Sequence, residues 1–262
     1  MLLRKQVQRL FFRWQTWLAI LIGLIIIVIQ ALTINKVNAN AANNAFLHLT
    51  GFDFSGAGTT IYYLILPLMC GLAASSTLQE DKKDHRLNEL LTRVTKRKYL
   101  CTTLISSFIV GGLVGVLPLL IESCYFFLNY HVTNVPKGRD FQIIDPNGCG
   151  YSLFIRNTLA FWLCTIVIAF VFSGLFSMIG IVTSYYNIHN GIELIMPFVL
   201  AFATIVVADL TGEVEASLYW VLTPTFSNTY SNGIYFILGY FVLITGLIAL
   251  LTWKESTKDV CN

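Results

Sequence analysis

The sequence predicts an all-α protein that crosses a membrane six times. Hydrophobic residues make up 56% of its 262 residues and charged residues only 12%, whereas a soluble domain carries about 25% charged residues. The apolar residues gather in six runs, several of them near the ~20 residues that a helix needs to cross a bilayer and two of them longer. This composition excludes a disordered chain and a water-soluble globule. We therefore expect one transmembrane domain over residues 1–262, with no separate soluble catalytic domain.

Each apolar run is predicted to be a helix. Only helices and closed barrels satisfy their backbone hydrogen bonds in lipid, and these runs lack the alternation of barrel strands. The predicted spans cover about residues 17–35, 59–78, 99–128, 153–184, 192–210 and 233–253. The third and fourth runs exceed one crossing, so each has room for a break or an interfacial extension. Residues 211–232 are apolar enough to dip back into the membrane, through Leu218, Trp220, Val221 and Leu222.

The positions of Lys and Arg predict that both termini lie on the inner side of the membrane. Thirteen of the 17 Lys and Arg residues lie in the N-terminal segment, the connection between the second and third spans, and the C-terminal tail. Such residues concentrate in cytoplasmic loops. The net charge of +3 is therefore interpreted as a topology signal and not as a nucleic-acid-binding surface. A signal peptide cleaved near Ala39-Asn40-Ala41 is the alternative, but the first run is longer than a signal core of about 7–15 residues.

Residues 1–16 are predicted to form an amphipathic helix in the inner headgroup layer. Apolar residues at helical spacing make one face: Leu3, Val7, Leu10, Phe11 and Trp14. Basic residues that suit anionic lipid supply the other side: Arg4, Lys5, Arg9 and Arg13. The alternative is a basic flank that only orients the first span.

A second amphipathic helix is predicted over about residues 84–96, between the second and third spans. Its apolar stripe recurs at i, i+3, i+4 and i+7: Leu87, Leu90, Leu91 and Val94. Glu80 and Asp81 precede the helix and Arg93 lies near its end, which matches the helix dipole. The stripe is too short to be a core by itself, so it needs a groove on a partner or the membrane surface. The alternative is a solvated charged loop with chance periodicity.

The same stretch resembles the permease subunits of type-2 ATP-binding-cassette (ABC) exporters, in their short six-span bacterial form. The matching residues are Glu80-Asp81-Lys82-Lys83, Leu87, Leu90-Leu91-Thr92-Arg93, Lys96-Arg97-Lys98 and Tyr99-Leu100. Gly111-Gly112 with Pro118 in the third span, and Pro224 after the fifth, are also similar to the family pattern. One departure is His85-Arg86, which stands where many members have a glycine in the acidic turn.

The resemblance implies a transport subunit driven by a partner. The helix at 84–96 would be a coupling helix docked on a separate ABC ATPase subunit, with seven contact residues: Glu80, Asp81, Leu87, Leu90, Leu91, Arg93 and Val94. The short connection Tyr185–Gly191 would be a second contact. Because the chain has no Gly-x-x-x-x-Gly-Lys-[Ser/Thr] loop, ATP and Mg²⁺ would bind the partner. This chain would then hold no cofactor and would not itself be an enzyme.

The family further implies a complex of two permease chains, as a homodimer or a heterodimer, with two ATPase subunits in a bacterial plasma membrane. Short permeases of this kind resemble exporters of amphipathic or antimicrobial peptides, including those that give immunity, and exporters of lipid-like molecules and drugs. The spans offer few charges to recognise a polar solute. We therefore expect an amphipathic or hydrophobic substrate.

The candidate residues for a substrate path are Glu122, Arg156 and Asp209, each near the outer end of an apolar run, with Glu193 at the inner end of the fifth. Glu122 and Arg156 are candidates for an ion pair. The alternative is that all four anchor the spans at the interfaces, where a charge costs less than at the bilayer centre. No carboxylate is predicted at mid-depth, where a proton-coupled carrier would have one.

Two other classes of function remain open at this point. A secondary transporter or channel that works alone is one, although no internal repeat is evident. An intramembrane enzyme is the other, with Ser173-Gly174 as a weak serine candidate that packing explains equally well. No metal site is predicted, because His131 and His189 are isolated and the chain has no His-Glu-x-x-His. The six cysteines are scattered without a Cys-x-x-Cys pair, so no disulfide framework is expected either.

Overall fold

The computed structural model describes residues 2–34, 44–52, 56–74, 77, 95–134, 150–186, 191–224 and 233–257. Five of the described helices are long and apolar enough to cross a membrane. They are α2 (Trp14–Thr33), α6 (Lys96–Asn129), α8 (Thr158–Tyr186), α9 (Ile192–Thr211) and α12 (Gly233–Thr257). The prediction of an all-α membrane protein is confirmed at this level.

The second predicted span contains a shorter apolar helix, α3 (Ala57–Ala74). At 1.5 Å per residue its length approaches the ~30 Å hydrocarbon layer without exceeding it. The helix lies at the centre of the bundle, where it packs against α2, α6, α8 and α9. Most of the residues directly after it are outside the described part of the chain. The count of six spans therefore stays a prediction.

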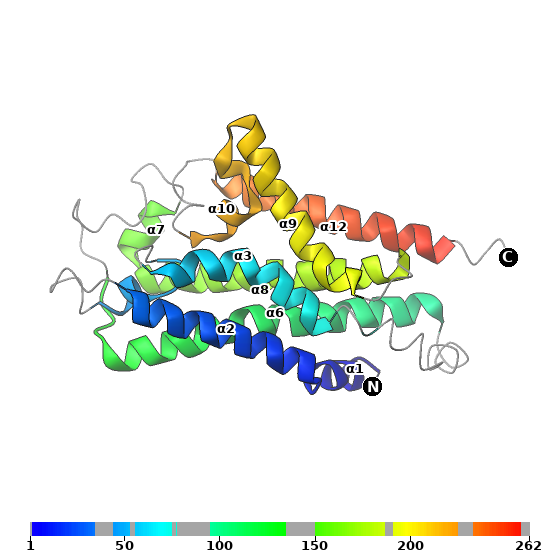
Figure 1. The fold of residues 1–262 in the computed structure, drawn as a ribbon, viewed down its shortest axis with the longest axis horizontal. Coiled ribbons are helices and arrows are strands. Elements are labelled where there is room, and N and C mark those ends of the chain that lie inside the picture. Colours follow the sequence, from blue (N-terminus) through cyan, green and yellow to red (C-terminus); the bar gives the residue numbers. More distant parts are fainter. Residues whose placement is uncertain are drawn as a thin grey trace.

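Consecutive long helices alternate in direction along the long axis of the molecule (Figure 1). α2, α3, α6 and α8 lie side by side, whereas α9 leans away from them. The short helix α1 (Leu2–Phe11) and the end of α12 lie toward one end of this axis. We call it the α1 end. The opposite end carries α7 (Tyr151–Arg156) and is called the α7 end.

A helix forms at the N-terminus but is shorter than predicted, over Leu2–Phe11, and is separate from the first span. Arg13 is extended, with φ −73° and ψ 143°, and α2 begins at the next residue, earlier than predicted. Val7 and the buried Leu10 of α1 pack against the main core, and Gln6 Nε2 donates to Thr103 Oγ1 of α6 at 3.2 Å. Protein thus covers part of the face that was expected to meet lipid. Trp14, from the same predicted face, is 69% exposed.

The two long apolar runs behave differently. The third forms one continuous helix of 34 residues, α6, which Pro118 does not interrupt. The fourth is broken at Asn157, where φ −155° and ψ 93° separate α7 from α8. The Asn157 side chain accepts from the Ala160 N–H at 3.1 Å, so it caps the start of α8. Of the two runs with room for a break, the fourth therefore contains one near its start and the third contains none.

Small residues bring α6 and α8 into close contact. Gly111 and Gly115 of α6 face Ser177 and Ser173 of α8, and both pairs are four residues apart, as in other closely packed membrane helices. A Cβ on Gly115 would lie 2.6 Å from Ser173 Cβ. Ser173 is fully buried in this interface. It therefore serves helix packing, and the structure gives no support to its alternative interpretation as a nucleophile.

Part of the apolar segment after α9 folds back onto the bundle. The 3₁₀ turn η3 (Val214–Ala216) and the short helix α10 (Leu218–Leu222) pack against α9, α12 and α3. Leu218, Val221 and Leu222 are buried. The Leu218 N–H donates to Thr204 Oγ1 at 3.1 Å, and Tyr240 Oη donates to the Ala216 carbonyl. Protein groups thus satisfy backbone atoms of this segment, as a re-entrant segment requires.

Candidate functional site

The start of α3 is held by two polar side chains from the end of α2. The Thr59 N–H donates to Gln30 Oε1 at 3.0 Å, and the Ala57 N–H donates to Thr33 Oγ1 at 3.1 Å. Both N–H groups belong to the first turn of α3, which has no acceptor within its own helix. Gly58 leaves room for Gln30, since a Cβ there would lie 2.8 Å from Gln30 Oε1. The polar residues near the end of α2 are therefore a cap for the next helix.

Glu122 is bound by a short segment that lies over the α7 end of the bundle. Its side chain, on α6, is only 2% exposed. Thr50 Oγ1 donates to Glu122 Oε1 at 2.7 Å, and the Thr50 N–H lies 3.1 and 3.2 Å from the two carboxylate oxygens. The Gly51 N–H in turn donates to Thr59 Oγ1 at 3.1 Å. Gly51 has a φ of +95°, which a residue with a side chain rarely adopts.

An aromatic cluster surrounds this segment. The 3₁₀ turn η1 (Ala45–His48) and the residues after it pack against the end of α6, α7 and the start of α8. The His48 ring lies 4.4 Å from the Tyr130 ring and 5.5 Å from the Phe126 ring, between centroids. Phe52 contacts Phe161 at 5.8 Å in an edge-to-face arrangement. Thr50 and Gly51 are thus held by packing on both sides.

Glu122 faces a recess that we call the polar recess. Its volume is about 250 Å³ when the open space at its mouth is included. The part that can hold a bound group is much smaller and has room for about one water-sized group. Three aromatic side chains line it, together with polar and aliphatic groups. The lining residues are Leu49, Thr50, Phe52, Tyr63, Leu119, Glu122, Trp162, Thr165 and Ile166. The recess therefore combines one buried carboxylate with aromatic walls and has no basic side chain among these residues.

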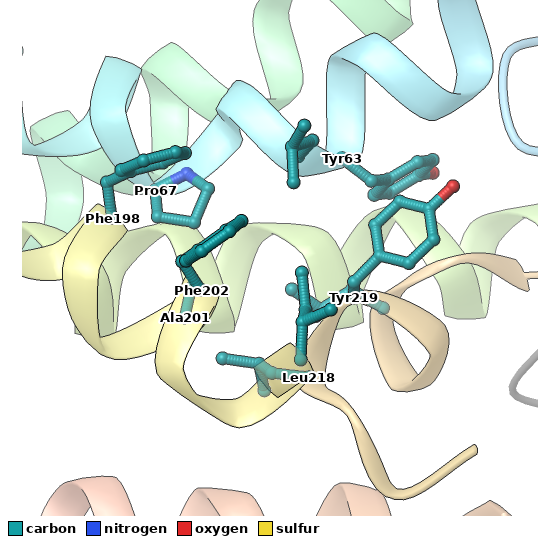
Figure 2. Close-up of a pocket in the computed structure, with 10 residues that line it drawn as sticks. Tyr63, Pro67, Phe198, Ala201, Phe202, Leu218 and Tyr219 are labelled. Carbon is teal, nitrogen blue, oxygen red and sulfur yellow. The ribbon is translucent and has the colours of Figure 1, made fainter. Parts of the chain in front are cut away.

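A second recess, the apolar recess, lies between α3, α9 and α10 (Figure 2). Figure 2 shows Tyr63 and Tyr219 at one end of it and Pro67 with Phe198 at the other. Leu218, Ala201 and Phe202 lie between these ends. Tyr63 lines both this recess and the polar one. A polar site and an apolar site thus share one side chain.

A third recess lies beyond Ala201 and Leu218, between α8, α9, α10 and α12. It encloses about 440 Å³ with open space included, and its lining is mostly aliphatic and aromatic, with Thr204 as a polar member. In the most apolar stretch of α6 and of α8, 61% of the stretch is buried inside the molecule. The corresponding share is 17% for α9 and 11% for α12. The apolar recess and this one therefore lie where a tightly packed group of helices meets two loosely packed ones.

The predicted path residues are not brought together. Glu122 is buried, whereas Arg156 at the end of α7 and Asp209 near the end of α9 are exposed. No ion pair joins Glu122 to Arg156, so that proposed pairing is wrong. Thr50 binds Glu122 in its place. The exposed Arg156 and Asp209 still fit the alternative that they anchor their spans at a membrane interface, whereas the buried Glu122 does not. Glu193, expected to be interfacial as well, is 2% exposed and accepts from the Gly191 N–H at 3.1 Å.

The predicted ATPase-coupling residues, Glu80, Asp81, Leu87, Leu90, Leu91, Arg93 and Val94, lie outside the described residues. The end of the predicted helix is described and needs a correction. Thr95 is extended, with φ −61° and ψ 143°, and Lys96 is the first residue of α6. A helix that begins at residue 84 therefore cannot run through to 96. The basic residues Lys96-Arg97-Lys98 form the first turn of α6 instead of preceding it.

Sequence reasoning did not identify Thr50, Tyr63 or Trp162 as site residues. Thr50 lies in a connection between two spans and follows no motif. Tyr63 and Trp162 each lie within an apolar run, where an aromatic residue is ordinary core. Gln30 was visible as a polar residue in an apolar run, but its acceptor role depends on a helix that starts 27 residues later at Ala57. Glu122 could be identified as a candidate site residue from the sequence, because carboxylates are rare in spans.

Metal and disulfide chemistry find no support in the part of the chain that the structure describes. No group of three or more His, Cys, Asp and Glu residues there is placed to hold a metal ion. Cys70 is buried and free, and Cys101, Cys124 and Cys164 are exposed and free. His131 contributes its backbone carbonyl, which accepts from the Ala45 N–H at 3.0 Å. Cys149, Cys261 and His189 lie outside the described residues.

No protein-family model matches the chain, and no curated protein sequence or solved structure matches it either. Its function is therefore inferred from its own residues and their arrangement.

Proposed function

We propose that this chain is the membrane-spanning subunit of an ATP-driven ABC exporter. The observation that supports the proposal is the position of the two helix ends that flank the charged connection at residues 78–94. The end of α3 and the start of α6 both lie at the α1 end, as does the end of α12 (Figure 1). The connection therefore joins two central helices at the same end as the basic N-terminal helix. An ATPase docked there would act directly on α3 and α6.

The connection has the chemistry of a docking element. Its apolar stripe, Leu87, Leu90, Leu91 and Val94, is flanked by charges and needs a groove to cover it. The chain has no phosphate loop of its own. We propose that two copies of a separate ATPase subunit bind ATP and Mg²⁺, and that two permease chains, identical or related, pair between them. ATP-driven closure of the ATPases would push on this connection in each permease.

The recesses suggest where a substrate passes. The apolar recess and the larger one beyond it separate the tightly packed helices from α9 and α12. Movement of these two loosely packed helices would break fewer contacts than movement of α3, α6 or α8. A lining that is mostly apolar favours an amphipathic or hydrophobic substrate, such as a peptide, a lipid-like molecule or a drug.

A stand-alone secondary transporter is the second candidate, because of Glu122. A buried carboxylate inside a span is costly, and in transporters such groups often line the path of an ion or proton. The full burial of Glu122 gives this alternative an observation that the sequence did not offer. It would predict uptake or export by the purified chain in liposomes with no ATPase present.

Purification of the tagged chain from its native membrane in mild detergent, followed by mass spectrometry, tests the proposal. We expect a stoichiometric soluble protein that carries a phosphate loop. The double variant Leu90→Asp, Leu91→Asp should bind this partner more weakly. The control His85→Asp, Thr92→Asp adds the same number of acidic side chains on the opposite face, by helical spacing, and should keep it. A chain that purifies alone and transports in liposomes without ATP would overturn the exporter and favour the second candidate.

A further inference from the structure

The polar recess has the composition of a site for a small organic cation. Glu122 supplies a carboxyl group that can pair with a positive charge, and Phe52, Tyr63 and Trp162 supply aromatic walls. Cations bind over aromatic faces because the ring quadrupole is negative there, and removal from water strengthens the attraction. None of the nine lining residues, all in the described part of the chain, is basic. A bound molecule with a positive charge would therefore meet no like charge from these side chains.

The carboxylate still has acceptor capacity for such a molecule. A carboxylate offers about four lone-pair sites. Thr50 is its only hydrogen-bond partner among the described residues, through one hydroxyl and one N–H. Glu122 Oε1 accepts from both groups, whereas Oε2 has only the longer contact, 3.2 Å, to the shared N–H. The Oε2 atom is thus the less saturated oxygen of a side chain that lines the recess.

The size of the recess selects among cations. It has room for about one water-sized group. A primary ammonium, with three hydrogens on nitrogen, is of that size and donates hydrogen bonds to a carboxylate. A quaternary ammonium is larger and donates none. Tyr63 lines the apolar recess as well, which is of the same size, so the Tyr63 side chain would have to turn aside for the remainder of a bound molecule to reach it.

We propose that the polar recess binds the primary ammonium group of an amphipathic molecule whose apolar part lies in the apolar recess. That this molecule is the transported substrate rests on the proposed function above; the binding itself does not. Two sources would supply such a group: a lysine side chain or N-terminus of an amphipathic peptide, and the headgroup of phosphatidylethanolamine. Both present an ammonium beside an apolar chain.

Trp162 provides the readout, because its side chain lines the recess. The protein is prepared with the other four tryptophans, Trp14, Trp17, Trp220 and Trp253, replaced by phenylalanine, and placed in nanodiscs of phosphatidylcholine. n-Hexylammonium is titrated while Trp162 fluorescence is recorded. We expect a saturable change with n-hexylammonium and none with hexanol or hexyltrimethylammonium. An equal response to hexanol, an equal response to the quaternary amine, or no saturable response to n-hexylammonium would overturn the proposal.

Glu122→Gln tests the carboxylate. Glutamine keeps the size of the side chain and an oxygen that accepts from Thr50, so we expect a folded protein with at least about tenfold weaker n-hexylammonium affinity, the effect of losing one charge-assisted hydrogen bond. Unchanged affinity would overturn the role of Glu122. If the variant does not fold, the comparison of n-hexylammonium with hexanol and hexyltrimethylammonium on the Glu122 protein still decides.

Two further arms separate the sources. One adds a lysine-containing amphipathic peptide, or the same peptide with its amines acetylated, to the phosphatidylcholine nanodiscs. The other replaces phosphatidylcholine with phosphatidylethanolamine. A response to the free-amine peptide alone identifies a peptide source, and competition by phosphatidylethanolamine against n-hexylammonium identifies a lipid source. If neither the peptide nor phosphatidylethanolamine gives a response, the amphipathic part of the proposal is overturned. No ATPase is present in these measurements, so their failure is distinguishable from failure of the exporter proposal.

Discussion

Among the residues themselves, several buried polar side chains bind backbone groups of neighbouring segments. Gln30 accepts from the Thr59 N–H at the start of α3, and Glu122 accepts from the N–H of Thr50. A buried donor without an acceptor costs about 1–3 kcal/mol, and no water is available in the hydrocarbon layer to replace a lost partner. Loss of one of these side chains is therefore expected to lower the free energy of unfolding.

Thr50→Val should lower the free energy of unfolding by about 1–3 kcal/mol. The substitution keeps the shape of the side chain and the backbone contact to Glu122, but it removes the hydroxyl that donates at 2.7 Å. The control Thr211→Val removes a hydroxyl that bonds only within the last turn of α9 in an exposed position, and its effect should stay within about 0.5 kcal/mol. Thermal unfolding in detergent measures both. Equal shifts in Tm would show that the Thr50 hydroxyl contributes nothing specific.

Gln30→Leu should destabilise the protein by a similar amount, about 1–3 kcal/mol, because the Thr59 N–H loses its acceptor while Gln30 is fully buried. The exposed Gln8 on α1 offers the same substitution without a buried donor, so Gln8→Leu should leave the Tm nearly unchanged. Hydrogen exchange would add a local readout, with faster exchange at the start of α3 in Gln30→Leu alone. Slow exchange there would contradict the capping role.

Among the elements, the pair α6 and α8 depends on the absence of side chains at particular positions. A Cβ on Gly111 would lie 2.8 Å from Ser177 Oγ and 3.1 Å from the backbone oxygen of Ser173. The Ser107 and Ser177 hydroxyls are hydrogen bonded at 2.6 Å in the same interface. Close backbone approach lets such groups meet across two membrane helices. This close contact between α6 and α8 would be lost if a side chain at position 111 forced one of the helices outward.

Gly111→Ala should therefore destabilise the protein by about 1–3 kcal/mol through overpacking. Gly246 of α12 is the matched control, because nothing lies within 4 Å of a Cβ built there. Gly246→Ala should be neutral or stabilising by up to about 1 kcal/mol, since alanine favours a helix over glycine. Unfolding temperatures of both variants in the same detergent measure the difference. A Gly111→Ala protein as stable as Gly246→Ala would mean that the two helices are less tightly coupled than their geometry indicates.

The helices of this protein are more predictable than the contacts between them. Apolar runs indicate spans because lipid imposes one solution on the backbone, and the observed ends of α9 and α2 differ from the predicted ones by a few residues at most. The bond between Thr50 and Glu122 joins positions 72 residues apart. No local pattern predicts such a contact, because it depends on where the 44–52 segment folds. The polar recess was for the same reason not predictable beyond Glu122 itself.

For the whole molecule, packing is uneven. α3, α6 and α8 form a tightly packed centre, while α9 and α12 keep most of their apolar surface free of contacts within this chain. Lipid or a second chain would cover such surface in a membrane. Helices with few buried contacts move at lower cost. The proposed exporter would therefore change shape mainly where α9 and α12 meet the centre.

Leu90→Asp with Leu91→Asp should uncouple ATP hydrolysis from transport while leaving the helical bundle folded. The two substitutions place charges on the predicted docking stripe. ATPase activity and substrate export are measured in proteoliposomes that contain both subunits, with His85→Asp, Thr92→Asp as the control. Normal export by the double variant would count against a coupling role for residues 84–94. A fall in export by the control as well would point to a general effect of charge.

The side chains that α2 gives to α3 also bear on how the chain enters a membrane. If α3 reached hydrocarbon before α2, the buried Thr59 N–H in its first turn would have no acceptor, at a cost of several kcal/mol. Gln30, alone in the bilayer, would carry an unsatisfied amide in the same way. Inserted together as a hairpin, the two helices cancel both costs, with Thr16 Oγ1 and the Ala73 carbonyl joined at the far end at 3.3 Å. During synthesis, α2 is therefore expected to wait at the translocon until α3 has emerged from the ribosome.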